Sequence, residues 1–150
     1  MTVLYESVPL GFVERAIDYD KPLFYDSETK GLYGEITLAQ FKQEHWGEAL
    51  VVESPNHARL QKLLKPCWVV CFNISYDMGT LGIAPIRMDD LYFAAKTAYP
   101  LQEKHSLDVT APQFYVGLDK ISLQKSFIRN TESLTDGQLH YGALDVYALE

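Results

Sequence analysis

Three short segments in the first third of the chain carry the apolar pattern of β-strands. The apolar run 22–25 predicts a first, buried strand, the alternation over 36–41 predicts a second, and the segment 48–53 predicts a third. Gly31 and Gly34 interrupt the pattern between the first two and indicate a turn. Three strands in succession predict an antiparallel meander.

Helical spacing follows from residue 54 onward. Ser54, Pro55 and Asn56 are typical of a helix start, and the apolar residues after them have helical spacing as far as Pro66. The apolar run 68–72 then predicts a central strand with both faces covered. Further helices are predicted over 76–81, 89–98, 106–116 and 134–149. A helix, a strand and a helix in this order favour a mixed sheet in an α/β fold.

Composition limits the size and the surroundings of this fold. The chain has 150 residues, of which 47% are hydrophobic, so one domain over 1–150 with one sizeable core is expected. Cys67 and Cys71 lack the further ligands of a zinc site and are interpreted as buried thiols of a reducing compartment. No apolar run approaches the roughly 20 residues that span a bilayer. A cytoplasmic protein without a membrane partner is therefore expected.

Acidic residues are the strongest functional signal. Asp26 and Glu28 stand two positions apart just past the first strand, so they share one side of the sheet. Such a pair alone is more often a solvated turn, but its place after a buried strand and the further acids Asp77 and Asp145 favour a metal site. Carboxylates without Cys or His suit Mg²⁺ or Mn²⁺, and four of them suggest two ions.

The net charge of −7 argues against broad electrostatic attraction to nucleic acid. It does not exclude an enzyme on nucleic acid, because cations bound to the acids would themselves bind phosphate. Two such ions predict phosphodiester hydrolysis. Tyr141 and His140 stand four and five residues before Asp145, and either could orient the attacking water. A residue four positions away shares a helix face with Asp145, so Tyr141 is the better candidate.

Three motifs resemble those of the DEDD, or DnaQ-like, 3′-5′ exonuclease superfamily in its tyrosine-bearing branch. They are Asp26-Ser-Glu-Thr-Lys-Gly-Leu32, Asn73-Ile-Ser-Tyr-Asp77 and Tyr141-Gly-Ala-Leu-Asp145. The stretches 105–107, 119–126 and 134–146 are similar to the ribonuclease D type, which includes Werner-helicase exonuclease domains. The resemblance covers about residues 20–150.

The resemblance implies a ribonuclease H-like fold, with helices flanking a mixed five-stranded sheet whose first three strands are antiparallel. It implies a pair of Mg²⁺ or Mn²⁺ ions held by Asp26, Glu28, Asp77 and Asp145, with Tyr141 positioning the water. It also implies contacts with the 3′-terminal nucleotide of a single strand from Thr29, Leu32 and Asn73. His140 fits the spacing of the family's histidine-bearing branch.

Three functions stay open at this point. The first is a free-standing exonuclease that releases nucleoside monophosphates, with DNA favoured over RNA, either trimmed in its last helix or minimal and phage-encoded. The second is the N-terminal proofreading domain of a larger polymerase. The third is a catalytically weak module that binds nucleic acid, suggested by the few basic residues expected at the cleft rim: Lys21, Lys30, Lys120, Lys125 and Arg129.

Overall fold

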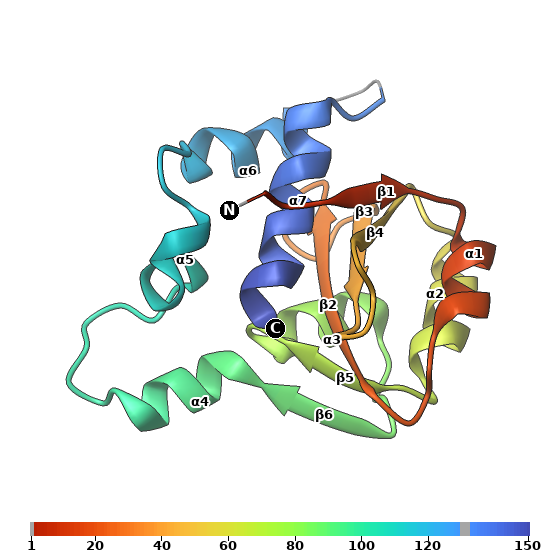
Figure 1. The fold of residues 1–150 in the computed structure, drawn as a ribbon, viewed down its shortest axis with the longest axis horizontal. Helices are drawn as coiled ribbons and strands as arrows, with labels where there is room; N and C mark the ends of the chain where they lie inside the picture. The colour runs from red at the N-terminus through yellow and green to blue at the C-terminus, as the bar shows by residue number, and fades with distance from the viewer. Residues whose placement is uncertain (1, 130–132) are drawn as a thin grey trace.

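The computed structural model describes residues 2–129 and 133–150, and the fold is α/β around one mixed sheet (Figure 1). The sheet has the strand order β1-β4-β3-β2-β5-β6. Its strands are β1 (Tyr5–Ser7), β2 (Pro22–Thr29), β3 (Ile36–Lys42), β4 (Ala49–Glu53), β5 (Trp68–Cys71) and β6 (Arg87–Asp90). Strands β2, β3 and β4 form the predicted antiparallel meander, whereas β1, β5 and β6 each pair in parallel.

The mixed sheet is confirmed, but within residues 2–129 and 133–150 it has six strands rather than five. The additional strand is β1, a three-residue edge strand that pairs in parallel with β4. Its residues are half-buried or exposed, so no alternation of apolar positions signals it in the sequence. Hydrogen bonds to β4 and the packing of the Tyr5 ring against His140 hold this short strand in place.

The helices are α1 (Leu10–Ala16), α2 (His57–Leu64), α3 (Ile74–Leu81), α4 (Leu91–Ala98), α5 (Leu107–Thr110), the 3₁₀ helix η1 (Pro112–Phe114), α6 (Lys120–Arg129) and α7 (Asp136–Leu149). The single helix predicted over 106–116 is therefore wrong. The segment is divided into α5 and η1, because Pro112 starts a separate 3₁₀ turn. The helix predicted over 89–98 begins only at Leu91, where Asp90 caps it by accepting a hydrogen bond from the Tyr92 amide. Helix α6 was not predicted.

In the part of the chain that the structure describes, two apolar cores lie on opposite faces of the sheet. One contains Val13 of α1, Leu60 of α2 and Leu81 of α3, packed against Tyr25 and Phe41. The other contains residues of α5, α6 and α7, packed against β3 and β4. Figure 1 shows α1 and α2 on one side of the sheet and α5, α6 and α7 on the other. None of the helices among the described residues is long and apolar enough to cross a membrane.

Strand β2 is longer than the run 22–25 predicts and includes both acids of the first motif. Its residues alternate between buried and half-buried, so Asp26 and Glu28 share the face that carries Phe24, whose ring packs in the α7 core. In the register with β3, Asp26 is paired with Gln40 and Glu28 with Leu38. The acids thus lie within the sheet, beneath α7, rather than in a turn.

Helix α7 crosses the sheet at very close range. A Cβ atom at Gly142 would lie 2.5 Å from Gln40 Nε2 and 2.7 Å from Leu38 Cδ2, so only glycine fits without displacing these buried side chains. A capping box between Thr135 and Gln138 begins the helix. This close crossing carries Asp145, three residues further along α7, to the acids of β2.

Candidate active site

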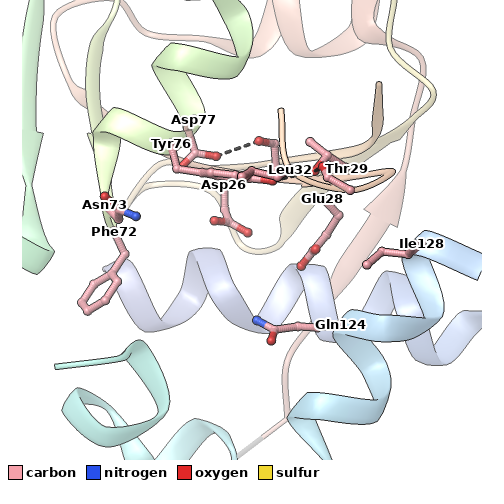
Figure 2. A pocket seen from close by; sticks show the side chains of 12 residues that line it. Asp26, Glu28, Thr29, Leu32, Phe72, Asn73, Tyr76, Asp77, Gln124 and Ile128 are labelled. Atoms are coloured by element: carbon pink, nitrogen blue, oxygen red, sulfur yellow. Dashed lines mark hydrogen bonds between the residues drawn. The ribbon is translucent and has the colours of Figure 1, made fainter. Parts of the chain in front are cut away.

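Three carboxylates meet between β2 and α7. Asp26, Glu28 and Asp145 each offer one oxygen atom, and these oxygens all lie within 4.8 Å of one another. Asp145 is almost fully buried, and the two β2 acids are half-buried. Figure 2 shows the side chains of Asp26 and Glu28 pointing in the same direction, toward α7. Residues from both ends of the chain thus form one acidic cluster.

Asp77, the fourth predicted acid, lies beside this cluster rather than within it. It stands in the first turn of α3, and Ser27 Oγ donates a hydrogen bond of 2.7 Å to Asp77 Oδ1 (Figure 2). Asp77 nevertheless lines the same pocket of about 330 Å³ as Asp26 and Glu28. The other lining residues are Ser27, Thr29, Gly31, Leu32, Phe72, Asn73, Tyr76, Gln124 and Ile128.

The acids raise one another's pKa. Burial, and then repulsion from neighbouring carboxylates, raises the pKa of Asp26 and that of Glu28 well above the usual range. Burial raises the pKa of Asp77 to about 7 and that of Asp145 to about 6. Lys120 of α6 lowers the pKa of Asp26 and Glu28 again by Coulombic attraction. Ionised together, the acids would concentrate negative charge in a poorly solvated place, and a bound cation would relieve it.

The donor set fits a hard divalent cation. The cluster consists of carboxylates, and neither a His nor a Cys belongs to it among the residues that the structure describes. Oxygen-only ligands suit Mg²⁺ and Mn²⁺ better than Zn²⁺. The same buried, mutually repelling carboxylates explain why a cation would stabilise this arrangement.

Tyr141 lies one helical turn before Asp145, as its spacing predicts, and its ring is buried against Phe127. Its hydroxyl makes no hydrogen bond of acceptable geometry with the described residues. Two polar side chains nevertheless lie near this hydroxyl. Gln124 lowers the pKa of Tyr141, and Tyr141 in turn lowers the pKa of Asp145. Burial and then Asp145 raise the pKa of Tyr141, so its hydroxyl keeps its proton at neutral pH.

His140 has a different neighbour. Its ring packs edge-on against Tyr5 of β1, with 6.0 Å between the ring centroids. It is not among the residues that line the acidic pocket. The structure therefore favours Tyr141 over His140 as the partner of the acids, in agreement with the helical spacing.

A second tyrosine, Tyr115, contacts the acids directly. Its hydroxyl donates a hydrogen bond of 2.5 Å to Asp145 Oδ1. Burial and then Asp145 raise the pKa of Tyr115, so its hydroxyl also remains a proton donor. The sequence placed Tyr115 within a predicted helix and no spacing connected it with Asp145, because the two residues meet only through the packing of α7 against the segment after η1.

The residues predicted to contact a nucleotide lie around the pocket. Thr29 Oγ1 donates to the Gly31 carbonyl over 2.6 Å and is 2.6 Å from the Tyr76 hydroxyl, which then donates to it. Leu32 is 77% exposed beside the acids, and Asn73 is exposed with a positive φ of 67°. Figure 2 shows α6 contributing Gln124 and Ile128 on the side of Glu28, a contribution that the sequence did not indicate.

The predicted rim cations are spread more widely than the pocket. Lys120 lies near the cluster, with Nζ 3.4 Å from Asp108 Oδ1. Lys30 pairs with Glu35 at 3.5 Å, and Lys21 is 4.0 Å from Asp18 at the opposite end of β2. Of these three lysines, Lys120 alone shifts the pKa values of the acids.

Comparisons with solved structures define the class of fold. The sequence matches no protein-family model, and no curated protein matches it either. Among solved structures, however, nucleases have the same fold, and several of them are ribonuclease D proteins. The chain therefore has the ribonuclease H-like fold of 3′-5′ exonucleases that the motif resemblance predicts.

Three particular structures illustrate the likeness. Brucella melitensis NrnC with bound Mg²⁺ is 21% identical with a TM-score of 0.70, and the match covers 99% of this chain and 77% of NrnC. Trypanosoma brucei RNase D in complex with RNA U12 is 17% identical with a TM-score of 0.72, over 99% of this chain and 60% of that protein. Escherichia coli RNase D, described as an exoribonuclease involved in structured RNA processing, is 19% identical with a TM-score of 0.64, over 97% of this chain and 42% of its own.

Proposed function

We propose that this protein is a metal-dependent 3′-5′ exonuclease. It would hydrolyse phosphodiester bonds from the 3′ end of a DNA or RNA strand and release nucleoside 5′-monophosphates. The observation that carries this proposal is the cluster of Asp26, Glu28 and Asp145, whose oxygens lie within 4.8 Å of one another beside a pocket lined by Asp77. The fold shared with nucleases supports it.

Asp26, Glu28, Asp77 and Asp145 would together hold two divalent cations, Mg²⁺ or Mn²⁺. Bound there, such ions lower the pKa of water and stabilise charge that develops on the phosphate oxygens. Mutual repulsion of the acids supports this assignment, because each carboxylate added to the cluster raises the free energy of the metal-free site. The bound Mg²⁺ of NrnC, a protein with the same fold, is consistent with it.

The remaining side chains would position the strand end and the water. Tyr141 offers a protonated hydroxyl beside Asp145 that makes no hydrogen bond of good geometry with the described residues, and it would orient the water that attacks the phosphorus. Leu32 is exposed at the pocket and would pack against the terminal base, while Thr29 and Asn73 would contact the same nucleotide. In the reaction the bond from phosphorus to the 3′ oxygen of the preceding nucleotide breaks, and that oxygen takes up a proton.

The proposal includes both DNA and RNA as substrates. The preference for DNA stays a prediction, and the RNA complex of Trypanosoma brucei RNase D gives a reason to test RNA equally. Discrimination would require a contact to the 2′-hydroxyl, since this group is what distinguishes the two strands at a given site. A cytoplasmic location and a phage origin are parts of the same proposal.

The test is digestion of 5′-labelled single strands of DNA and RNA of equal sequence, with Mg²⁺, Mn²⁺ or EDTA. The wild-type protein should produce a ladder that shortens one nucleotide at a time and needs the metal. Asp26→Asn should abolish the ladder, whereas Asp20→Asn, which changes an exposed acid outside the pocket, should leave it intact. Divalent binding without shortening would favour the binding module instead, and an internal cut would contradict the exonuclease.

A further inference from the structure

Two tyrosines lie close to Asp145, and they are placed differently. Tyr141 belongs to the same helix, α7, and its hydroxyl has no partner of good geometry among the described residues. Tyr115 comes from the segment after η1 and donates its hydroxyl proton to Asp145 Oδ1 over 2.5 Å. Both members of that bond are buried, Tyr115 with 8% and Asp145 with 5% of its surface exposed. A buried hydrogen bond to a carboxylate is among the stronger ones in proteins.

Tyr115 is itself held in place from two sides. Its backbone amide donates to the Pro112 carbonyl over 3.1 Å, and its carbonyl accepts from the Leu118 amide over 3.2 Å. Lys120 Nζ lies 4.8 Å from the centre of its ring and also pairs with Asp108 of α5. The backbone of Tyr115 is therefore held by η1 and the turn after it, and its ring contacts Lys120 at the start of α6. None of these segments carries an acid of the cluster.

We propose that Tyr115 is a positioning residue that fixes the Asp145 carboxylate for cation binding. The inference rests on the proposed function, since it concerns the cation that Asp145 would help to hold. By occupying one lone pair of Oδ1, Tyr115 sets the rotation of the carboxylate and leaves the remaining lone pairs for the metal. Partners in the layer behind metal ligands commonly contribute ten- to hundredfold to metal affinity.

The geometry separates the roles of the two tyrosines. The hydroxyl proton of Tyr115 is committed to Asp145, so this residue cannot also donate to an attacking water. The hydroxyl of Tyr141 makes no hydrogen bond of such geometry with a described residue, although it lies near enough to Asp145 to lower the pKa of that carboxyl. Loss of the Tyr115 hydroxyl should therefore weaken cation binding, whereas loss of the Tyr141 hydroxyl should slow turnover and leave cation binding unchanged.

The test is calorimetric titration of Mn²⁺ into the protein without nucleic acid, in wild type, Tyr115→Phe and Tyr141→Phe. Tyr147→Phe is the matched control, because it removes a tyrosine hydroxyl that is not near the acids. This hydroxyl donates a hydrogen bond of 3.0 Å to the Leu4 carbonyl. We expect Tyr115→Phe to weaken Mn²⁺ binding about tenfold. The other two variants should bind within twofold of wild type, and Tyr141→Phe alone should lose turnover while keeping its affinity.

Melting temperatures in EDTA separate positioning from folding. Tyr115→Phe should still fold and should melt a few degrees below Tyr147→Phe, since a buried hydrogen bond to a carboxylate contributes more than exposed ones to backbone carbonyls. Should Tyr115→Phe melt far lower, the double variant with Asp145→Asn would measure the Tyr115–Asp145 coupling in the metal-free protein, and a coupling of zero would overturn the proposal.

The two proposals fail in different ways. Wild-type affinity in a folded Tyr115→Phe, in a protein that does bind Mn²⁺ and does shorten strands, overturns the positioning role alone. A wild-type protein that binds Mn²⁺ but degrades nothing overturns the exonuclease, while a tenfold loss in Tyr115→Phe would still support positioning. A wild-type protein that binds no Mn²⁺ overturns both.

Discussion

Ser27 donates a 2.7 Å hydrogen bond to Asp77 Oδ1 and thereby joins β2 to α3 at the wall of the acidic pocket. Ser27 stands between Asp26 and Glu28 but on the opposite face of β2, because side chains alternate along a strand. A single strand therefore supplies two acids of the cluster on one face and the partner of the fourth acid on the other. This connection explains why Asp77 faces the pocket although it lies outside the group of three.

Replacing Ser27 by alanine should shift the pH dependence of activity upward. The Ser27 hydrogen bond lowers the pKa of Asp77 by favouring its ionised form, so without it the carboxyl loses its proton only at higher pH. A hydrogen bond to a charged group contributes about 1.5–3 kcal/mol, which corresponds to a shift of about one pH unit or more. The acidic limb of kcat/KM between pH 5.5 and 8.5 measures this.

The matched control is Ser122→Ala, which removes a hydrogen bond of 2.7 Å from Ser122 Oγ to Asp119 on the exposed start of α6. Its pH profile should coincide with that of the wild type. Coincident profiles for Ser27→Ala and wild type would contradict the coupling between Ser27 and Asp77.

The metal-free protein should become less stable as the pH rises from about 5 to 8. Burial raises the pKa of Asp77 to about 7 and that of Asp145 to about 6, both above the unfolded value of 3.8. In this window the folded protein binds more protons than the unfolded chain, so its stability falls with increasing pH. Thermal melts in EDTA at several pH values should show this. The melting temperature should fall by about 2–4 °C for each kcal/mol lost from the free energy of unfolding.

Mg²⁺ should reverse this trend, because it replaces the protons and binds best where the acids are ionised. Its stabilising effect on the melting temperature should be larger at pH 8 than at pH 5.5. The Asp77→Asn variant should show a shallower pH dependence in EDTA than wild type. A metal-free melting temperature that rises from pH 5 to 8 would contradict the raised pKa values.

Gly142→Ala should destabilise the fold and displace α7 from the sheet. The new Cβ would lie 2.5 Å from Gln40 Nε2 and 3.0 Å from Gln40 Cγ, in a fully buried place. Overpacking of this kind costs roughly 1–3 kcal/mol, and urea unfolding measures it. Because Asp145 follows three residues later on the same helix, Mn²⁺ binding should weaken as well.

Gly137→Ala is the control within the same helix, since its Cβ would contact Thr135 Oγ1 at 3.9 Å and nothing nearer. Alanine has the higher helix propensity, so this variant should be neutral or stabilised by up to about 1 kcal/mol. Equal stability of both variants would contradict a close crossing of α7 over β3.

Glu150→Gln should destabilise the end of α7. Lys42 Nζ lies 2.7 Å from Glu150 Oε2, and the lysine side chain is only 3% exposed. The ammonium also donates to the carbonyls of Gln43 and Trp46, and Glu150 is 28% exposed. We therefore expect a loss of about 1–3 kcal/mol, below the 3–5 kcal/mol typical of breaking a fully buried pair.

Glu35→Gln provides the comparison, because it breaks the exposed pair with Lys30 at 3.5 Å. An exposed pair of this kind contributes about 0–1 kcal/mol. Chemical unfolding of both variants measures the difference between their free energies of unfolding. A cost for Glu150→Gln no greater than that for Glu35→Gln would refute a stabilising role of the buried pair.

The acids of the site could be predicted from the sequence because their signals are local. Asp26 and Glu28 follow an apolar run, and Tyr141 stands four residues before Asp145 on a helix. The sequence nevertheless predicts a strand that ends at residue 25, since Asp, Ser and Glu are poor strand formers. Pairing with β3 overrides this preference as far as Thr29.

Other parts of the site depend on contacts between distant segments, which no spacing reveals. Tyr115 contacts Asp145 only after α5, η1 and α7 have packed together. The start of helix α6, in contrast, has a local signal in the sequence. Asp119 accepts hydrogen bonds from the amide and the hydroxyl of Ser122, as a residue preceding a helix commonly does.

The register of β2 against β3 decides which side chains of β2 face the acidic pocket. Asp26 pairs with Gln40, and the odd-numbered neighbours Ser27 and Thr29 face the other core. A slip by one residue would exchange the two sets of side chains, so that the carboxylates would take the places of Ser27 and Thr29, against Asp77 and Tyr76 of α3. Inserting or deleting one residue within β2 before Asp26 would thus abolish the acidic cluster without removing any acid, whereas an inserted pair would preserve its orientation.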